Sequence, residues 1–201
     1  YLLNASIRRD GASQFYPNPY GWFPSIGGGW VITNESFMKD QHVFDNLKLR
    51  GSWGKVGNSV VPINPSVQTV AADPYLTAIF GNPQVAYQGA SINTIVPPLT
   101  VWEKAVATDF GIEGSILHNK LSFEADYYNR KTEDAIFAIP VLASIGTNSG
   151  NLIGNQATIQ NKGFEITITW KDRVGSDFGY SISGNIGVNN NKVLSVESGK
   201  N

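Results

Sequence analysis

Apolar and polar residues alternate with a period of two along much of this chain, which is typical of β-strands with one apolar and one polar face. The clearest case runs from Trp102 to Phe137, where two alternating stretches are joined only by His118, Asn119 and Lys120. Two such stretches around so short a link predict an antiparallel hairpin.

The two faces of this hairpin differ sharply in chemistry. Carboxylates gather on one face, at Asp109, Glu113, Glu124 and Asp126. The opposite face is apolar and carries Phe110, Ile112, Ile116, Leu121, Phe123 and Tyr127. Strands of this kind occur both in soluble β-sandwiches and in membrane β-barrels, and the two differ in whether the apolar face meets a core or lipid.

Five further stretches alternate in the same way and predict strands. Together with the hairpin they give seven antiparallel, up-and-down strands, so the expected fold class is all-β. The two segments from Ser59 to Val101, which is rich in proline, and from Ala138 to Asn161 are expected to be long irregular loops. Asn34 is expected to cap a helical turn. The five additional strands are Tyr1 to about Gln14, Gly21 to Thr33, Leu47 to about Asn58, one around Phe164 to Lys171, and Phe178 to about Asn190.

The connections are unequal in length in a way that favours the barrel. Short links at 34–46, 118–120 and 172–177 alternate with the long segments, and only the short link at 15–20 departs from this order. Barrels of the outer membrane have short periplasmic turns and long external loops. Aromatic residues near both sets of links, such as Trp170 by a short turn and Trp102 by a long loop, would form two interfacial belts.

Composition agrees with an all-β chain that has little charge to expose. Only 15% of the 201 residues are Asp, Glu, Lys or Arg, and the chain holds 21 Gly, 5 Trp, 8 Tyr and 10 Phe. A formal net charge of -1 makes nucleic acid an unsuitable partner. Cysteine is absent, which excludes disulfides and thiolate metal sites. No apolar run is long enough for a transmembrane helix, although a barrel needs none.

Candidate catalytic and binding groups are few. The four carboxylates of the hairpin could form an acid/base pair, but a wetted polar face explains them better. The only two histidines, His42 and His118, lie far apart in sequence and predict no metal site. We therefore expect neither an enzyme nor a cofactor. Three aromatic residues in the first long loop remain as candidates for contact with a substrate or a lid protein: Tyr75, Phe80 and Tyr87.

Five segments, in order along nearly the whole chain, resemble the barrel of the SusC/RagA family of TonB-linked outer-membrane transporters. Their joint occurrence is far more specific than any one of them. They are FPSIGGGWVITNESF (Phe23 to Phe37), LKLRGSWGKVGN (Leu47 to Asn58), WEKAVATDFGIEGSI (Trp102 to Ile116), LSFEADYYNRKTEDAIF (Leu121 to Phe137) and NKGFEITITW (Asn161 to Trp170).

The resemblance implies an importer of glycans, peptides or other large nutrients in the outer membrane of a Gram-negative, Bacteroidetes-type bacterium. Its implied partners are outer-membrane lipid, a SusD-like surface lipoprotein that lids the barrel, and TonB, which would act through an N-terminal region missing here. Residues 1–201 are expected to be a piece of the barrel, without the plug domain and the remaining strands. The competing hypothesis is a secreted β-sandwich that binds glycans or acts as an adhesin.

Overall fold

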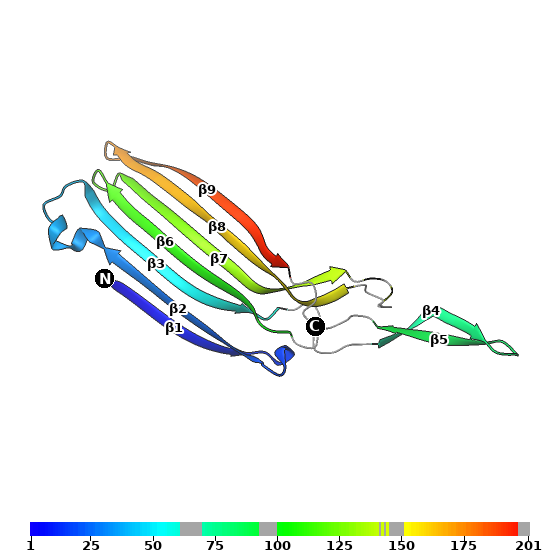
Figure 1. The fold of residues 1–201 in the computed structure, drawn as a ribbon. Helices are drawn as coiled ribbons and strands as arrows, with labels where there is room; N and C mark the ends of the chain where they lie inside the picture. The colour runs from blue at the N-terminus through cyan, green and yellow to red at the C-terminus, as the bar shows by residue number, and fades with distance from the viewer. Residues whose placement is uncertain (61–69, 93–99, 141, 143, 145–150, 197–201) are drawn as a thin grey trace.

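The computed structural model describes residues 1–60, 70–92, 100–140, 142, 144 and 151–196. In these residues seven strands form one antiparallel sheet and two more form a separate hairpin (Figure 1). Along the large sheet the order is β1 (Leu2–Gly11), β2 (Tyr20–Val31), β3 (Phe44–Asn58), β6 (Glu103–Ile116), β7 (Leu121–Pro140), β8 (Asn151–Val174) and β9 (Phe178–Val196).

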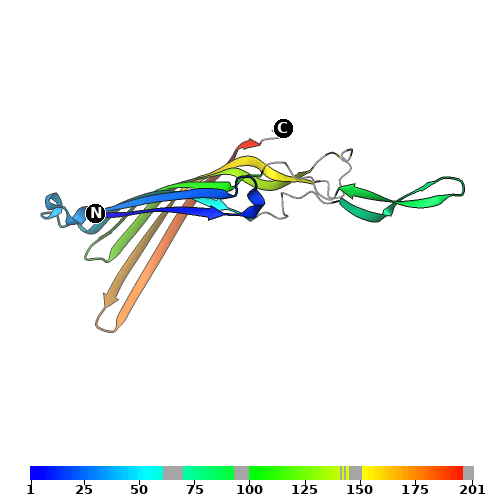
Figure 2. The same cartoon turned by 90° about the horizontal axis from the view of Figure 1, so that it is seen from below.

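Each strand pairs with its neighbour in the order of the chain, apart from the hairpin inserted between β3 and β6. The sheet is strongly twisted: seen from below, β8 and β9 run at a clear angle to β1 and β2 (Figure 2). The predicted up-and-down, all-β topology is therefore confirmed. A sheet of this twist and connectivity matches part of a barrel wall.

The predicted central hairpin is formed by β6 and β7, and its register pairs apolar residues with apolar ones and a carboxylate with a carboxylate. Phe110 pairs with Tyr127 and Glu113 with Glu124, so the apolar series of the two strands share one face and the carboxylates share the other. The link covers residues 117–120, one residue longer than predicted. Leu117, His118 and Asn119 adopt positive φ angles there, which lets the chain reverse within four residues.

The division into two faces continues across the whole sheet. On the apolar face, Phe110 is 60% exposed, Ile168 49% and Ile182 67%. A β-sandwich would bury such a face against a second sheet. The second sheet in the described part of the chain, the hairpin of β4 (Val70–Phe80) and β5 (Val85–Ile92), lies beyond one end of the large sheet and does not cover it (Figure 1).

Two of the predicted loops contain strands. The segment 59–101 holds the β4–β5 hairpin, where Pro74 lies in a register shift between Asp73 and Thr77 and Pro83 lies in the turn. Prolines at a bulge and in a turn remove no regular ladder hydrogen bond, so they do not prevent pairing. The prediction of a loop over residues 138–161 is wrong for most of that segment, because β7 and β8 stay paired out to Pro140 and Asn151.

The link between β2 and β3 consists of two 3-10 turns, η2 (Ile32–Asn34) and η3 (Ser36–Met38). Asn34 ends the first turn and caps neither, so the predicted helix cap is wrong. Glu35 separates the turns, and its carboxylate accepts a hydrogen bond of 2.8 Å from the indole of Trp30. Because Trp30 is part of β2, this bond ties the link to the sheet.

A small aromatic core closes the opposite end of the sheet. Phe15, from the turn η1 (Ser13–Phe15), is fully buried against Trp102, with ring centroids 4.9 Å apart. Phe23 also packs against Trp102, with ring centroids 5.3 Å apart, and the Trp102 indole donates a hydrogen bond of 3.2 Å to the carbonyl of Pro19. This cluster fastens the β1–β2 link to the start of β6.

Candidate functional site

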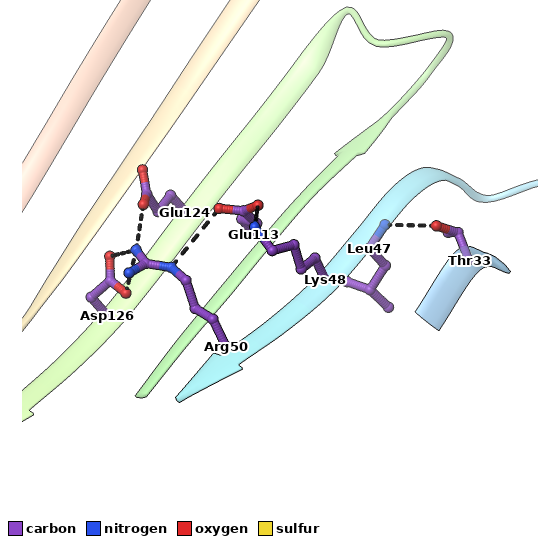
Figure 3. Close-up of polar contacts among 7 residues, drawn as sticks. All are labelled: Thr33, Leu47, Lys48, Arg50, Glu113, Glu124 and Asp126. Carbon is purple, nitrogen blue, oxygen red and sulfur yellow. Dashed lines mark hydrogen bonds and ion pairs between the residues drawn. The ribbon is translucent and has the colours of Figure 1, made fainter. Parts of the chain in front are cut away.

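The most connected group of charges lies at the centre of the polar face, where three strands contribute to it (Figure 3). We call it the central charge cluster. Its cations, Lys48 and Arg50, both come from β3, and the carboxylates come from β6 and β7. The five members are Lys48, Arg50, Glu113, Glu124 and Asp126.

Arg50 reaches across the neighbouring strand to bind acids on the strand after it. Its guanidinium lies 2.6 Å from a carboxylate oxygen of Glu124 and 2.7 Å from Asp126, both on β7. The strand in between is β6, and the residue that pairs with Arg50 there is Gly111. A Cβ at Gly111 would lie 2.8 Å from the Arg50 Nε, which is too close, so the glycine leaves the room through which Arg50 passes.

The cations of the cluster offset repulsion that the register creates. Glu113 on β6 lies directly opposite Glu124 on β7, and like charges in such positions repel. Lys48 holds Glu113 at 2.7 Å while Arg50 holds Glu124, so the two opposed glutamates are paired with different cations. The groups are between 25% and 48% exposed, so they meet water as well as one another.

Asp109, the fourth predicted carboxylate, lies on the same face but outside the cluster. Together with Arg50, Tyr128, Arg130 and Glu165 it lines a polar hollow of about 550 Å³. Its carboxylate has no hydrogen bond or ion pair with the residues that the structure describes. The structure thus brings three of the four predicted carboxylates into one ion-paired network and leaves the fourth beside the polar hollow.

This arrangement favours a charged wall over catalysis. Glu113, Glu124 and Asp126 are each held in an ion pair with Lys48 or Arg50, so their carboxylates belong to the network of the wall. Within the described ranges, no three His, Cys, Asp or Glu side chains lie close enough together to hold a metal ion. None of the helices described is long and apolar enough to cross a membrane.

The six residues predicted for the apolar face all lie on it. Phe110, Ile112 and Ile116 pair in register with Tyr127, Ala125 and Leu121, and Phe123 pairs with Gly114. Their neighbours on β8 are also apolar, since Tyr127 pairs with Phe164 and Phe123 with Ile168. The apolar surface is therefore continuous over adjacent strands.

Two of the three loop aromatics lie together on the separate hairpin. The rings of Phe80 and Tyr87 are 6.2 Å apart, and the side chains are 62% and 57% exposed. Tyr75 belongs to β4, and its side chain lies outside the described part of the structure. The hairpin thus presents an exposed aromatic pair beyond the end of the sheet (Figure 1).

Two functional features had no signal that a single sequence reveals. The reach of Arg50 over Gly111 depends on the register of three strands, and neither residue stands out alone. The aromatic core of Phe15, Phe23 and Trp102 joins residues up to 87 positions apart in the chain, between Phe15 and Trp102. Only the alternation on β2, which puts Phe23 on the polar face, could have hinted at it.

Comparison with known families and proteins adds independent information. The family described as TonB dependent receptor-like, beta-barrel matches residues 1–197. TonB-dependent receptor P3 of Formosa agariphila is 32% identical over 200 residues, which are 99% of this chain and 19% of that protein. TonB-dependent receptor SusC of Bacteroides thetaiotaomicron is 30% identical over 203 residues, or 99% of this chain and 20% of SusC.

Solved structures agree with the sequence comparison. A chain in the structure of the RagAB peptide transporter superposes with a TM-score of 0.81 at 26% identity, covering 96% of this chain and 20% of that one. The RagAB peptide importer in its open-open state gives a TM-score of 0.77. The present chain therefore spans about one fifth of the length of the relatives that it matches.

Proposed function

Since the chain belongs to the TonB-dependent receptor family and is part of its β-barrel, we propose that it forms neighbouring strands in the wall of an importer for a large nutrient. The family places it in the outer membrane of a Gram-negative bacterium and in a receptor barrel rather than an enzyme. The remaining strands and a plug domain would come from the rest of the full-length protein, of which this chain is about one fifth.

The observation that carries this proposal is the exposed, continuous apolar face. In the barrel, this face contacts lipid acyl chains, where exposed apolar side chains are stable. The lipid-facing residues include Phe110, Ile112, Ile116, Leu121, Phe123 and Tyr127. The polar face, with Asp109, Glu113, Glu124 and Asp126, lines the lumen between wall and plug.

Orientation follows from the links. Three links lie at the end with the aromatic core, and one of them is the long segment that contains the β4–β5 hairpin. At the other end, the β6–β7 and β8–β9 links are short, with four and three residues. The β2–β3 link, residues 32–43, is an exception in length but is folded into compact turns. Short turns are typical of the periplasmic side, so the aromatic-core end faces outward.

The exposed hairpin offers a contact for a lid protein. A two-stranded hairpin alone is marginally stable in water, and this one exposes Phe80 and Tyr87 beyond the sheet. We assign the pair to a SusD-like surface lipoprotein, and TonB would act through another part of the full-length protein. The solved relatives are named as a peptide transporter, and the cargo proposed here is a large nutrient such as a peptide or a glycan.

Cysteine labelling in cells tests the wall assignment. Ile186 and Asn185 are adjacent on β9 but belong to the apolar and the polar face, through pairs with Ile166 and Thr167. In a full-length protein with no other cysteine, Ile186→Cys should react with a lipid-soluble maleimide, and Asn185→Cys only with a water-soluble one. A secreted sandwich would bury position 186, so a failure of Ile186→Cys to react with the lipid-soluble reagent would contradict a lipid-facing wall.

Co-purification tests the lid contact. The double variant Phe80→Ala and Tyr87→Ala should retain less lipoprotein, because it removes both rings from one side of the hairpin. Ile79 and Gln88 point to the opposite side in the register, so Ile79→Ala with Gln88→Ala is the matched control. Equal retention of the lipoprotein by both variants would refute the assignment.

A further inference from the structure

On six of the seven strands of the sheet, the apolar face ends in a cation on the side of the aromatic core. The cation lies two or four residues in the sequence from the last large apolar side chain of its strand. Because every second residue lies on the same face, it is the next or the second-next side chain on that face. We call these six residues the cation belt. The pairs of last apolar residue and cation are Ile7 and Arg9, Trp53 and Lys55, Val106 and Lys104, Tyr127 and Lys131, Phe164 and Lys162, and Val188 and Lys192.

The seventh strand, β2, supplies aromatic rings at this level in place of a cation. The Arg9 guanidinium lies 4.0 Å from the centroid of the Tyr20 ring and 5.5 Å from that of Trp22. Such rings prefer the boundary between acyl chains and headgroups, and they hold a cation there by attraction to the ring face. The belt therefore lies at the level expected for lipid headgroups.

Three adjacent strands carry a denser part of this belt, which we call the lysine–amide patch. Its six residues form two rows in which lysines and amides alternate. One row pairs Asn129 with Lys162 and Lys162 with Asn190. The other row pairs Lys131 with Gln160 and Gln160 with Lys192. Neighbouring strands lie about 4.8 Å apart, so Lys131 and Lys192 flank Gln160 at about 10 Å from each other.

Most of these cations lack a protein counter-ion. Lys131 pairs with Glu133 and Lys104 with Asp134, each at 3.0 Å. The other four, Arg9, Lys55, Lys162 and Lys192, form no ion pair with any residue that the structure describes. Six cations against two carboxylates leave +4 on this surface (6 − 2 = 4), although the whole chain has a formal net charge of -1.

The opposite end of the apolar face has no such excess. There Lys120 is paired with Asp172 at 2.8 Å, and the face ends in aromatic residues such as Trp170 and Tyr180. The positive charge is thus confined to the outward end. A ligand for it must be anionic and must also tolerate the apolar surface that continues directly below.

We propose that the lysine–amide patch binds the phosphate-bearing sugar headgroup of a glycolipid in the outer leaflet. Phosphate oxygens accept hydrogen bonds from the ammonium groups of Lys131, Lys162 and Lys192. The amides of Asn129, Gln160 and Asn190 match sugar hydroxyls with the donors and acceptors left over from the 2.9 Å hydrogen bond that Gln160 donates to Asn129. The acyl chains lie on the apolar face below. This assignment rests on the proposed function, since it requires that face to contact lipid and the aromatic-core end to face outward.

The first arm of the test changes the ligand and leaves the protein intact. Binding of phosphorylated lipid A to the detergent-purified, full-length protein is measured by native mass spectrometry, with the same lipid after removal of its phosphates as control. The phosphorylated form should bind at least about tenfold more tightly, since charge attraction acts on three lysines. Equal binding of the two forms would overturn the proposal.

The second arm changes the protein. The triple variant Lys131→Gln, Lys162→Gln and Lys192→Gln should lose the preference for phosphate while keeping the unboiled electrophoretic mobility of a folded barrel. Its matched control removes the same charge near the turn end, through Lys39→Gln, Lys171→Gln and Arg173→Gln, and should bind as the natural protein does. A triple variant that keeps the preference would place the ligand elsewhere and refute the patch.

Inorganic phosphate separates a lipid site from a simple anion site. A large excess of it should not displace phosphorylated lipid A, because it lacks the sugar and acyl contacts. Full displacement would show that the patch recognises phosphate alone and would overturn the lipid assignment. Failure of the proposed function is distinguishable, because it would appear in the labelling of Ile186→Cys and Asn185→Cys, which involves no lysine.

Discussion

Placing an arginine on the apolar face should destabilise the barrel far more than placing one on the polar face. Ile168 suits this test because it is 49% exposed and pairs with Gly184, around which there is open space, so an arginine side chain fits without a clash. Any cost of Ile168→Arg then reflects transfer of charge into lipid rather than overpacking. Thr167→Arg, one residue away, points to the polar face beside Glu124 and is the control.

The position of Ile168 along β8 sets the magnitude. It lies six positions along the strand from Lys162 in the cation belt. A strand that rises about 3.4 Å per residue with a tilt of about 40° covers about 15 Å of depth in that distance. The apolar band of such a barrel is about 25 Å tall, so Ile168 lies near its middle. An arginine there costs about 2–4 kcal/mol, which lowers the folding equilibrium by about thirtyfold to nearly a thousandfold.

Folding of the full-length protein into lipid vesicles measures this difference. The folded fraction is followed across a guanidinium titration by the mobility of unboiled samples, with the natural sequence alongside. Thr167→Arg should cost under about 1 kcal/mol, because its charge meets water and a carboxylate. If the two variants were destabilised equally, or Thr167→Arg more, the assignment of the faces to lipid and lumen would be refuted.

Two further pairs of variants test the packing of the barrel wall. Gly111→Val should displace the side chain of Arg50 and lower the free energy of unfolding by about 1–3 kcal/mol. Gly184→Val, with open space around it, should change stability little, and the melting temperatures of the two variants compare them directly. Phe15→Ala removes a fully buried ring, which should destabilise that local cluster by about 3–5 kcal/mol and expose residues 12–19 to protease. Tyr16→Ala, at a side chain that is 76% exposed, should leave them protected, and equal cleavage of the two variants would refute the role of the cluster.

The alternation along the chain was sufficient to predict the sheet and its two faces. In the β6–β7 hairpin, a link of four residues fixes the register, and the register then places every second residue on a known side. The six apolar residues and four carboxylates predicted for opposite faces are therefore found on opposite faces. Their contacts with lipid and lumen remain predictions that the labelling experiment addresses.

What the alternation missed depends on contacts between distant segments. The ends of β7 and β8, where Pro140 pairs with Asn151, extend past the rest of the sheet. Backbone hydrogen bonds between the two strands form there without any alternation of apolar and polar side chains, so the sequence pattern did not reveal them. The β4–β5 hairpin was hidden because proline usually marks a break, and here Pro74 coincides with a bulge. The reach of Arg50 depends on which residue of β6 lies opposite, and a single sequence does not state that register.

The two groups of cations differ in where their counter-ions come from, and this difference predicts opposite responses to charge reversal. Lys48 is 25% exposed and is paired with Glu113 at 2.7 Å. Lys48→Glu would add a fourth carboxylate to the three of the central charge cluster and should lower barrel stability in any lipid. Lys162 has no acidic partner in the described residues, so Lys162→Glu should be harmful only in membranes with anionic headgroups and nearly neutral in zwitterionic ones. Folding yields of both variants in the two kinds of vesicle measure this. A Lys162→Glu defect that was the same in both lipids would mean that the belt cations act within the protein, as Lys48 does.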